Sequence, residues 1–317
     1  MKGLLKTKSA GVQLAVVISI ALVSFTMLGG IIGPIIISAI NGMSLGEIAS
    51  PAKWDLSQAK YANLLRALQV IQFFTLFVIP VWFGAKLFSE NSREYLRIRK
   101  PWNPLYYLAG AGMLLLSLPF VEWLGQINQQ IPFPESWTSW MQDKEDGASN
   151  MIKGLLSRHT ISDLLLNIVF IAGLAAVGEE LLFRGMLQRL FIKLFRSHWA
   201  GIIVSAFLFS AIHMQFFGFL PRFALGIVLG MVYWYSGSLW VAIAAHFAYD
   251  AILITVAYFS PQNLDIEKGG NIPDIALYAA ASFLVISLIG TWMVKVSKTT
   301  YTDIYADDSV PVKDNPF

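Results

Sequence analysis

Two things are scarce in this chain of 317 residues: cysteine, which is absent, and charged side chains. Without cysteine the chain has no disulfide, no thiolate-bound zinc or iron–sulfur site and no thiol nucleophile. Charged residues make up 14% of the sequence, whereas an ordinary soluble domain has about 25%. The net charge is only +3, and no stripe of basic residues could follow a phosphate backbone. The composition excludes an ordinary soluble protein, and we expect no nucleic-acid partner.

Apolar sequence is abundant instead. Hydrophobic residues make up 56% of the chain, in several runs of the length that crosses a bilayer, about 20 residues. A charge at the centre of a membrane helix costs about 2.5 to 3.5 kcal/mol, so charge-free intervals locate the spans. Four such intervals lie between these pairs of charged residues: Lys8 and Glu47, Arg66 and Lys86, Lys100 and Glu122, Asp274 and Lys295. Four more apolar helices are expected over 164–187, 199–217, 223–235 and 239–259.

These runs predict an all-α polytopic membrane protein with about eight transmembrane helices around a polar cavity. The helix over 223–235 is short enough to be re-entrant or buried, which would leave seven spans. Basic residues gather at two connections: Lys86, Arg93, Arg97, Arg99 and Lys100 after the second span, and Arg189, Lys193 and Arg196 after the fourth. The positive-inside rule places both connections in the cytoplasm. With an even number of spans, the N- and C-termini are cytoplasmic too.

The chain divides into four segments by composition. Residues 1–160 hold the first three spans and an outer loop, 161–260 the polar-bearing helical core, 261–298 the last span, and 299–317 a polar, disordered cytoplasmic tail. Within the outer loop, residues 126–160 mix aromatic and polar side chains and form either amphipathic helices at the membrane interface or a solvated loop. Thr160 is a plausible N-cap for the fourth span.

The fourth span contains a polar motif, GEELLFRG, over residues 178–185. Glu180 and Arg184 are four residues apart, so they share a helix face and can pair. Glu179 is turned away by about 100° and has no such partner. An unpaired carboxylate in a low dielectric binds a proton more tightly, which suits a group that takes a proton from water and passes it on. Alternatively, both glutamates simply lie among the headgroups near Arg189.

Two later spans carry histidines inside apolar runs: His213, and His246 followed by Asp250. A lone membrane histidine is often just hydrogen-bonded to a neighbouring helix. His246 and Asp250 share a face, so the aspartate either orients the imidazole or joins it in holding a ligand. By the helical rise, Glu179 lies about 12 Å from the end of its span at 187, and His246 lies about 12 Å from the start of its span at 239. His213 lies about 21 Å from the start of its span at 199. The groups can therefore meet between the cytoplasmic half and the midplane of the bilayer.

Three motifs, taken in their order along the chain, resemble those of the CAAX protease and bacteriocin-processing family of intramembrane proteases. They are Glu179-Glu180-x-x-x-Arg184, Phe209-x-x-x-His213 and His246-x-x-x-Asp250. The resemblance covers about residues 163–258. It implies a membrane endopeptidase that hydrolyses peptide bonds of membrane-associated protein or peptide substrates, in CAAX-type or bacteriocin-type processing or immunity. The family also implies a multi-pass protein of the bacterial inner (plasma) membrane, with residues 161–260 as its catalytic core.

The resemblance assigns a role to each polar residue. Glu179 would activate the water and Arg184 would hold Glu180, with the site completed by His213, His246 and Asp250. Many relatives have asparagine at the position of Asp250. An ionised aspartate cannot donate a hydrogen bond to an oxyanion, so this sequence departs from the family there.

Two mechanisms are compatible with these residues. In the first, His213, His246 and Glu179 bind zinc, Asp250 lies in or beside the ligand set, and an open position takes the water. In the second no metal is bound, Glu179 is the general base, and one histidine stabilises the oxyanion. The second is slightly favoured, because it uses the unpaired carboxylate.

Two other classes of membrane protein use similar groups. A proton- or cation-coupled transporter places ionisable residues along a path across the bilayer, but here they gather on three polar-bearing spans, and the sequence shows no internal repeat. An inactive immunity or scaffold protein would keep the motifs for stability alone, and the intact Glu179, His213 and His246 argue against it. The sequence therefore predicts a protease whose partners are the lipid bilayer and a membrane-associated peptide or protein.

Overall fold

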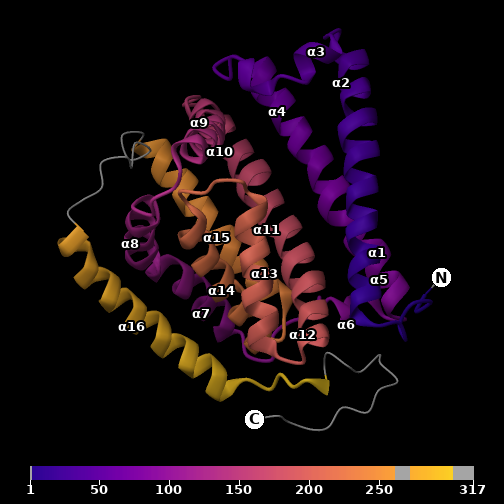
Figure 1. Cartoon of the computed structure of the whole chain (residues 1–317), viewed down its shortest axis with the longest axis vertical. Coiled ribbons are helices and arrows are strands. Elements are labelled where there is room, and N and C mark those ends of the chain that lie inside the picture. The colour runs from indigo at the N-terminus through magenta and orange to yellow at the C-terminus, as the bar shows by residue number, and fades with distance from the viewer. Residues whose placement is uncertain (1, 261–271, 303–317) are drawn as a thin grey trace.

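The computed structural model describes residues 2–260 and 272–302, and this part of the chain is helical without any strand (Figure 1). Seven of its helices are long and apolar enough to cross a membrane: Ala10–Asn41, Ala59–Phe88, Leu105–Gln129, Ile161–Phe195, Phe219–Ser236, Leu239–Phe259 and Ile275–Val296. A shorter apolar helix, His198–Ile212, follows the fourth of them. The all-α polytopic fold is confirmed, and the chain is a multi-pass membrane protein.

Several long helices consist of shorter units joined by π-helical turns. The first contains α1 (Ala10–Val23), a π segment (Ser24–Ile32) and α2 (Gly33–Asn41), and the second contains α4 (Ala59–Gln72), a π segment (Phe73–Val78) and α5 (Ile79–Phe88). Pro34 and Pro80 stand at the start of α2 and α5, directly after these π segments. A proline lacks the backbone N–H, so one helical hydrogen bond is left unmade there.

The fourth long helix carries the predicted glutamates. It consists of α10 (Ile161–Asn167), a π segment (Ile168–Gly173), α11 (Leu174–Glu179), a second π segment (Glu180–Gln188) and α12 (Arg189–Phe195). The other elements are α3 (Leu45–Ile48), a 3₁₀ turn (Pro51–Lys53), α6 (Ser92–Tyr95), α7 (Leu105–Leu116), α8 (Leu118–Gln129), α9 (Glu135–Leu156), α13 (His198–Ile212), α14 (Phe219–Ser236), α15 (Leu239–Phe259) and α16 (Ile272–Val296).

The structure corrects the expected lengths of the fifth and sixth helices. The expected long helix over 199–217 stops at Ile212, because the backbone of Met214 turns into the left-handed region with φ of 55°. The expected short helix over 223–235 instead begins at Phe219 and has 18 residues, enough to cross. Helical bonding continues through Arg222, which precedes the expected start. The short helix is therefore α13.

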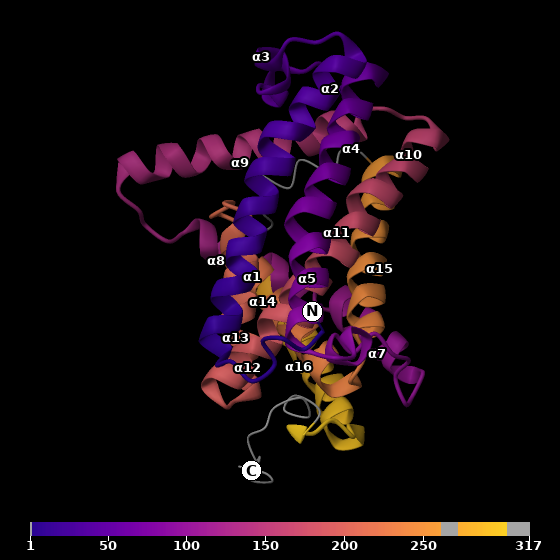
Figure 2. The ribbon, with the colours of Figure 1, turned by 90° about the vertical axis from the view of Figure 1, so that its right-hand side faces the viewer.

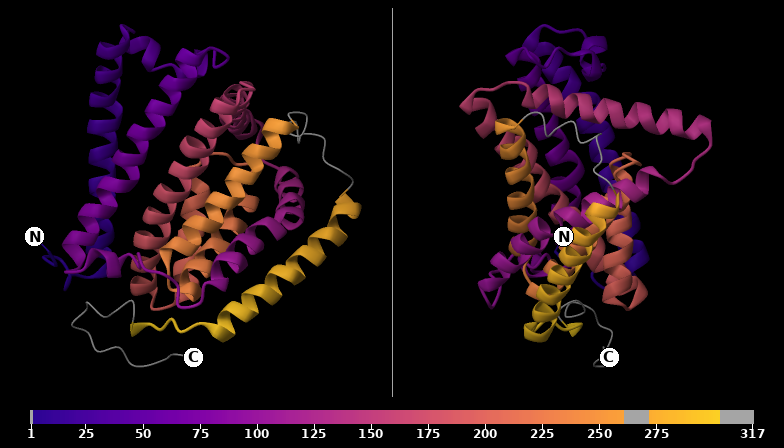
Figure 3. Two further views of the ribbon diagram at one scale, coloured as in Figure 1. Left: turned by 180° about the vertical axis from the view of Figure 1, so that it is seen from behind. Right: turned by 90° about the vertical axis from the view of Figure 1, so that its left-hand side faces the viewer.

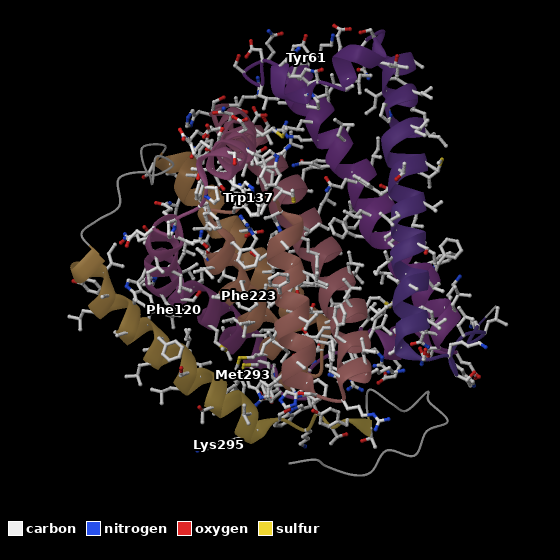
Figure 4. All side chains as sticks on the ribbon, in the orientation of Figure 1. Tyr61, Phe120, Trp137, Phe223, Met293 and Lys295 are labelled. Carbon is white, nitrogen blue, oxygen red and sulfur yellow. The ribbon has the colours of Figure 1, made fainter. Side chains whose placement is uncertain are left out.

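The basic connections lie together at one end of the molecule. The connection with α6, the turn between α12 and α13, and the last turn of α16 with Lys295 lie at the same end as the N-terminus (Figures 1 and 4). This is the arrangement that the positive-inside prediction requires. That this end faces the cytoplasm stays a prediction. Residues 261–271 before the last span and residues 303–317 of the expected tail lie outside the described residues.

Two hydrophobic clusters hold the bundle together on either side of the glutamate-bearing helix. One is formed by residues of α7, α14, α15 and α16, and the other by residues of α1, α5, the π segment Glu180–Gln188 and α12. Val177 packs against the first cluster, whereas Phe183 and Met186 are buried in the second. The helices α2 and α4 diverge from the bundle towards the end opposite the N-terminus (Figure 3). The glutamate-bearing helix is thus fixed from two sides.

The outer segment forms a helix, α9, which runs across the direction of the bundle helices (Figure 2). A buried polar cluster ties its end to the bundle: Arg66 Nη2 lies 3.0 Å from Asp163 Oδ1 and 2.8 Å from Asn167 Oδ1. Arg158 Nε, just after α9, lies 3.1 Å from Asp163 Oδ2. Thr160 caps α10 by accepting a hydrogen bond from the backbone N–H of Asp163. The predicted N-cap is confirmed.

Candidate functional site

The predicted polar residues of three different segments meet inside the bundle. Glu179 ends α11, Glu180 begins the following π segment, His213 follows α13, and His246 and Asp250 lie on α15. His213 Nε2 lies 3.8 Å from Glu179 Oε1, and His246 Nε2 lies 4.0 Å from Glu179 Oε2. All six residues of the sequence prediction therefore belong to one cluster, counting Arg184 through its contact with Glu180.

The predicted pair of Glu180 and Arg184 is formed, and it is fully buried. Arg184 Nη1 donates to Glu180 Oε1 at 2.7 Å, and the two side chains are 1% and 0% exposed. Arg184 Nη2 also donates to the carbonyl of Gly226 on α14 at 3.2 Å, and its guanidinium lies 4.5 Å from the centre of the Phe209 ring. Arg184 therefore ties Glu180 of the glutamate-bearing helix to α14.

His246 connects Glu180 with Asp250. Its Nδ1 lies 2.9 Å from Glu180 Oε1, and its Nε2 lies 3.3 Å from Asp250 Oδ2. Ionised carboxylates only accept hydrogen bonds, so either the ring carries a proton on both nitrogens or one carboxyl keeps its own proton. In both cases the ring is fixed in orientation by two oxygens.

Glu179 differs from Glu180 in making no close ion pair. Its separations from the two histidines, 3.8 and 4.0 Å, are too long for direct hydrogen bonds. His213 Nδ1 lies 2.7 Å from the carbonyl of Phe209, which only accepts, so Nδ1 carries a proton and Nε2 is the ring nitrogen that faces Glu179. The prediction that Glu179 stands apart from the Glu180 pair agrees with this geometry.

Four of the six residues of the cluster line a cavity of about 570 Å³. Its polar lining comes from Glu179, His213, Gln215, Arg222, His246, Tyr249 and Asp250, and the rest is mainly apolar, including Leu114, Val121, Ile152, Leu156, Leu225 and Leu253. Such a combination of apolar walls with a few convergent polar groups is typical of a ligand site.

Sequence reasoning missed Arg222, Gln215 and Tyr249. Arg222 is an isolated charge between the two expected apolar helices 199–217 and 223–235, which is a signal that could have found it. Tyr249 adjoins Asp250 in sequence, and nothing in its spacing distinguished it. Gln215 lies in the connection between α13 and α14, whose path only the fold determines.

The depth of Glu179 also differs from the expectation. The fourth helix runs on to Phe195, beyond the expected end at Leu187. Glu179 is therefore about 24 Å from that end and about 27 Å from the start at Ile161, by the helical rise. It lies near the middle of this helix, and the expected closeness to the cytoplasmic end is not supported by its position in the helix.

Gly178 allows the glutamate-bearing helix to approach the second long helix closely. A Cβ at this position would lie 2.7 Å from Phe77 Cδ2 and 3.0 Å from Phe73 Cδ2. We expect Gly178→Ala to destabilise the protein by about 1 to 3 kcal/mol through overpacking, and to displace the Glu179 carboxylate. Melting temperature measures the first effect, and the cleavage rate of the protease that the resemblance implies measures the second. At Gly173, on the same helix, an added Cβ meets only the Ile168 carbonyl at 3.5 Å. Gly173→Ala should therefore preserve both properties, and equal losses in the two variants would contradict the packing argument.

The residues of the predicted zinc site are the right types but are not arranged as a metal centre. Imidazole and carboxylate are ordinary zinc ligands. In the described part of the chain, however, no group of three or more histidine and acidic side chains is placed so that it could hold a metal ion. Both nitrogens of His246 face carboxylate oxygens instead. The side chains as they stand thus do not form a zinc-ligand set, and the mechanism proposed below uses the side chains alone.

Comparison with known proteins places the site in a recognised sequence segment. Residues 161–252 match the family described as type II CAAX prenyl endopeptidase Rce1-like. The chain is also similar to YpbD, an uncharacterized protein of Bacillus subtilis (strain 168), with 32% identity over 112 residues, 34% of this chain and 51% of that protein. The match therefore spans about half of the length of this relative. No solved structure matches the chain. The matched segment contains all six predicted residues, and the resemblance to the CAAX protease family is confirmed.

Proposed function

We propose that the chain is an intramembrane endopeptidase that hydrolyses peptide bonds of membrane-associated peptides or proteins, with Glu179 activating the water. One observation carries the proposal: an unpaired carboxylate lies within 4.0 Å of two histidines at the wall of a cavity among transmembrane helices. The name of the matching family supports CAAX-type processing as the reaction.

Glu179 is the general base in this proposal. Its carboxylate takes a proton from a water molecule, and the water oxygen attacks the carbonyl carbon of the scissile peptide bond. The carbon–nitrogen bond then breaks, and Glu179 returns the proton to the leaving amine nitrogen. The His213 Nε2 lone pair accepts the second O–H of the attacking water, which orients its oxygen towards the substrate.

His246 supplies a hydrogen bond to the oxyanion from its Nε2–H, which lies 3.3 Å from Asp250 Oδ2 in the structure and is shared with the substrate oxygen once the peptide is bound. Glu180 fixes its ring through Nδ1, and Nε2 faces the cavity beside Asp250 and Glu179. A donor held before the reaction stabilises the charge that develops on the carbonyl oxygen without reorganisation. Asp250 cannot donate while ionised, so its role is to orient the imidazole.

The proposed substrate is a peptide segment in or at the membrane. The cavity lies among transmembrane helices and is lined mostly by apolar side chains, so an apolar chain loses little by leaving the lipid. A peptide bond cannot be hydrolysed without water, and buried polar groups such as these are expected around a wet intramembrane cavity.

The test compares the peptide termini of the membrane proteome in cells that express the wild type or matched amounts of Glu179→Gln. Termini found only with the wild type support proteolysis and identify candidate substrates. Reconstitution of one such substrate with the purified protein separates direct from indirect cleavage. If the termini are the same and no candidate is cleaved, an inactive immunity or scaffold protein becomes the better interpretation.

A metal-free mechanism predicts that chelation leaves the reaction unchanged. We expect cleavage by the purified protein to survive treatment with a strong zinc chelator and dialysis, because no step uses a metal. The zinc content of the wild type and of His246→Ala, measured by mass spectrometry, should be equally low. Activity that is lost on chelation and returns only with zinc would instead support the metal mechanism through His213, His246, Glu179 and Asp250.

A further inference from the structure

Arg222 is a cation on the wall of the cavity that forms no ion pair within the described residues. Its Nη2 donates to Gln215 Oε1 at 2.9 Å, and its Nη1 lies 3.4 Å from the Gln215 carbonyl oxygen. Both acceptors are neutral. By contrast, the buried Arg184 and Arg66 contact carboxylates at 2.7 and 3.0 Å. The hydrogen bonds of Arg222 therefore direct its guanidinium without a carboxylate at ion-pair distance, and Glu145 and Glu179 attract it only from farther away.

The surroundings of Arg222 hold the guanidinium in place. Gln215 Nε2 donates to Glu145 Oε1 of α9 at 3.3 Å. Asn128 of α8 accepts from the backbone N–H of Leu220 at 2.8 Å and donates to the Phe216 carbonyl at 2.7 Å. These bonds fix the connection between α13 and α14 against α8 and α9. A guanidinium held in this way loses little conformational entropy when it binds an anion.

We propose that Arg222 binds a carboxylate group of the peptide substrate and thereby sets which peptide bond reaches Glu179. This inference rests on the proposed endopeptidase function. A guanidinium binds a carboxylate through two parallel hydrogen bonds, and an anion that enters an apolar cavity needs such a partner. Arg222 and Glu179 line the same cavity. An extended peptide advances about 3.3 Å per residue, so anchoring one carboxylate fixes the distance to the bond that is cleaved.

Two groups of a peptide supply this chemistry: its C-terminal carboxylate and an acidic side chain. Binding is measured with the full-length chain carrying Glu179→Gln, reconstituted in lipid nanodiscs, so that no probe is cleaved. The probes are one apolar peptide of alanine, leucine and valine with a fluorophore at its amino end, its C-terminal amide, and the amide form with one residue replaced by glutamate.

We expect the free-acid peptide, the glutamate peptide or both to bind about tenfold more tightly than the plain amide. Adding Arg222→Gln should remove this preference, whereas Arg222→Lys should keep part of it. The plain amide should bind Arg222→Gln as tightly as before, which shows that the cavity is intact. Arg93→Gln, which removes an exposed arginine on α6, is the matched control and should keep the full preference.

The free-acid and glutamate peptides identify the source of the carboxylate. Equal affinity for all three probes, no binding of any probe, or a preference that survives Arg222→Gln would overturn the proposal. The readout is binding of probes to a chain whose Glu179 is replaced, so a wild type that fails to cleave peptides does not change the result of this binding experiment. Conversely, a wild type that cleaves peptides without any carboxylate preference would refute the role of Arg222 and leave the endopeptidase function standing.

Discussion

Glu179→Gln is expected to abolish peptide-bond hydrolysis while leaving the fold unchanged. A glutamine amide has almost the same shape as the carboxylate but cannot take a proton from water. A positioned general base contributes about 10² to 10⁴-fold to the rate, so cleavage should fall by at least that range. Glu179 makes no close ion pair in the described residues, so little stabilising energy is lost with its charge. Single-turnover cleavage of a reconstituted substrate and the melting temperature in detergent measure the two quantities.

The matched control removes a carboxylate far from the cavity. Glu135 is exposed at the start of α9, and Glu135→Gln should retain the wild-type rate. Glu180→Gln keeps an acceptor for His246 but leaves Arg184 without its carboxylate, so it should reduce both the rate and the stability. If Glu179→Gln remains active while Glu180→Gln is inactive, the base is Glu180 and the proposed division of roles is wrong.

Arg184→Met is expected to lower the free energy of unfolding by about 3 to 5 kcal/mol. The methionine fills similar volume, but Glu180 is then buried without its cationic partner, and breaking a buried ion pair from one side costs that much. Glu180 Oε2 already has no hydrogen-bond partner, so the remaining charge would rely on His246 alone. The Gly226 carbonyl also loses its donor. Thermal unfolding in detergent measures the loss, and cleavage should fall with it because His246 is positioned through Glu180.

The double variant Glu180→Gln with Arg184→Met separates the pair from its surroundings. With both charges removed, the penalty of an unpaired buried charge disappears, and part of the lost stability should return. A melting temperature for Arg184→Met equal to that of the wild type would show that the guanidinium is hydrated. It would also refute the interpretation of this pair as a fixed support.

The local pairs of the site were predictable because helical spacing determines them. Residues four apart share a face, which predicted the contacts of Glu180 with Arg184 and of His246 with Asp250. The contact between His246 and Glu180 was not predictable in this way. It joins α15 to the glutamate-bearing helix over 66 positions of sequence, and spacing carries no information about such a distance. The place of Arg222 on the cavity wall was missed for the same reason, since it depends on how α13 and α14 pack.

The sequence alone determined that this is an all-α membrane protein, where most of its helices lie, and which rare polar residues its apolar spans contain. It does so because the bilayer excludes unpaired charges and unbonded backbone, so hydropathy directly limits the possible structures. Only the tertiary structure decided that α13 is the short helix, that two histidines face Glu179, and that Arg222 shares their cavity. These features depend on packing between helices distant in sequence, where shape and hydrogen bonds select among many arrangements with the same hydropathy.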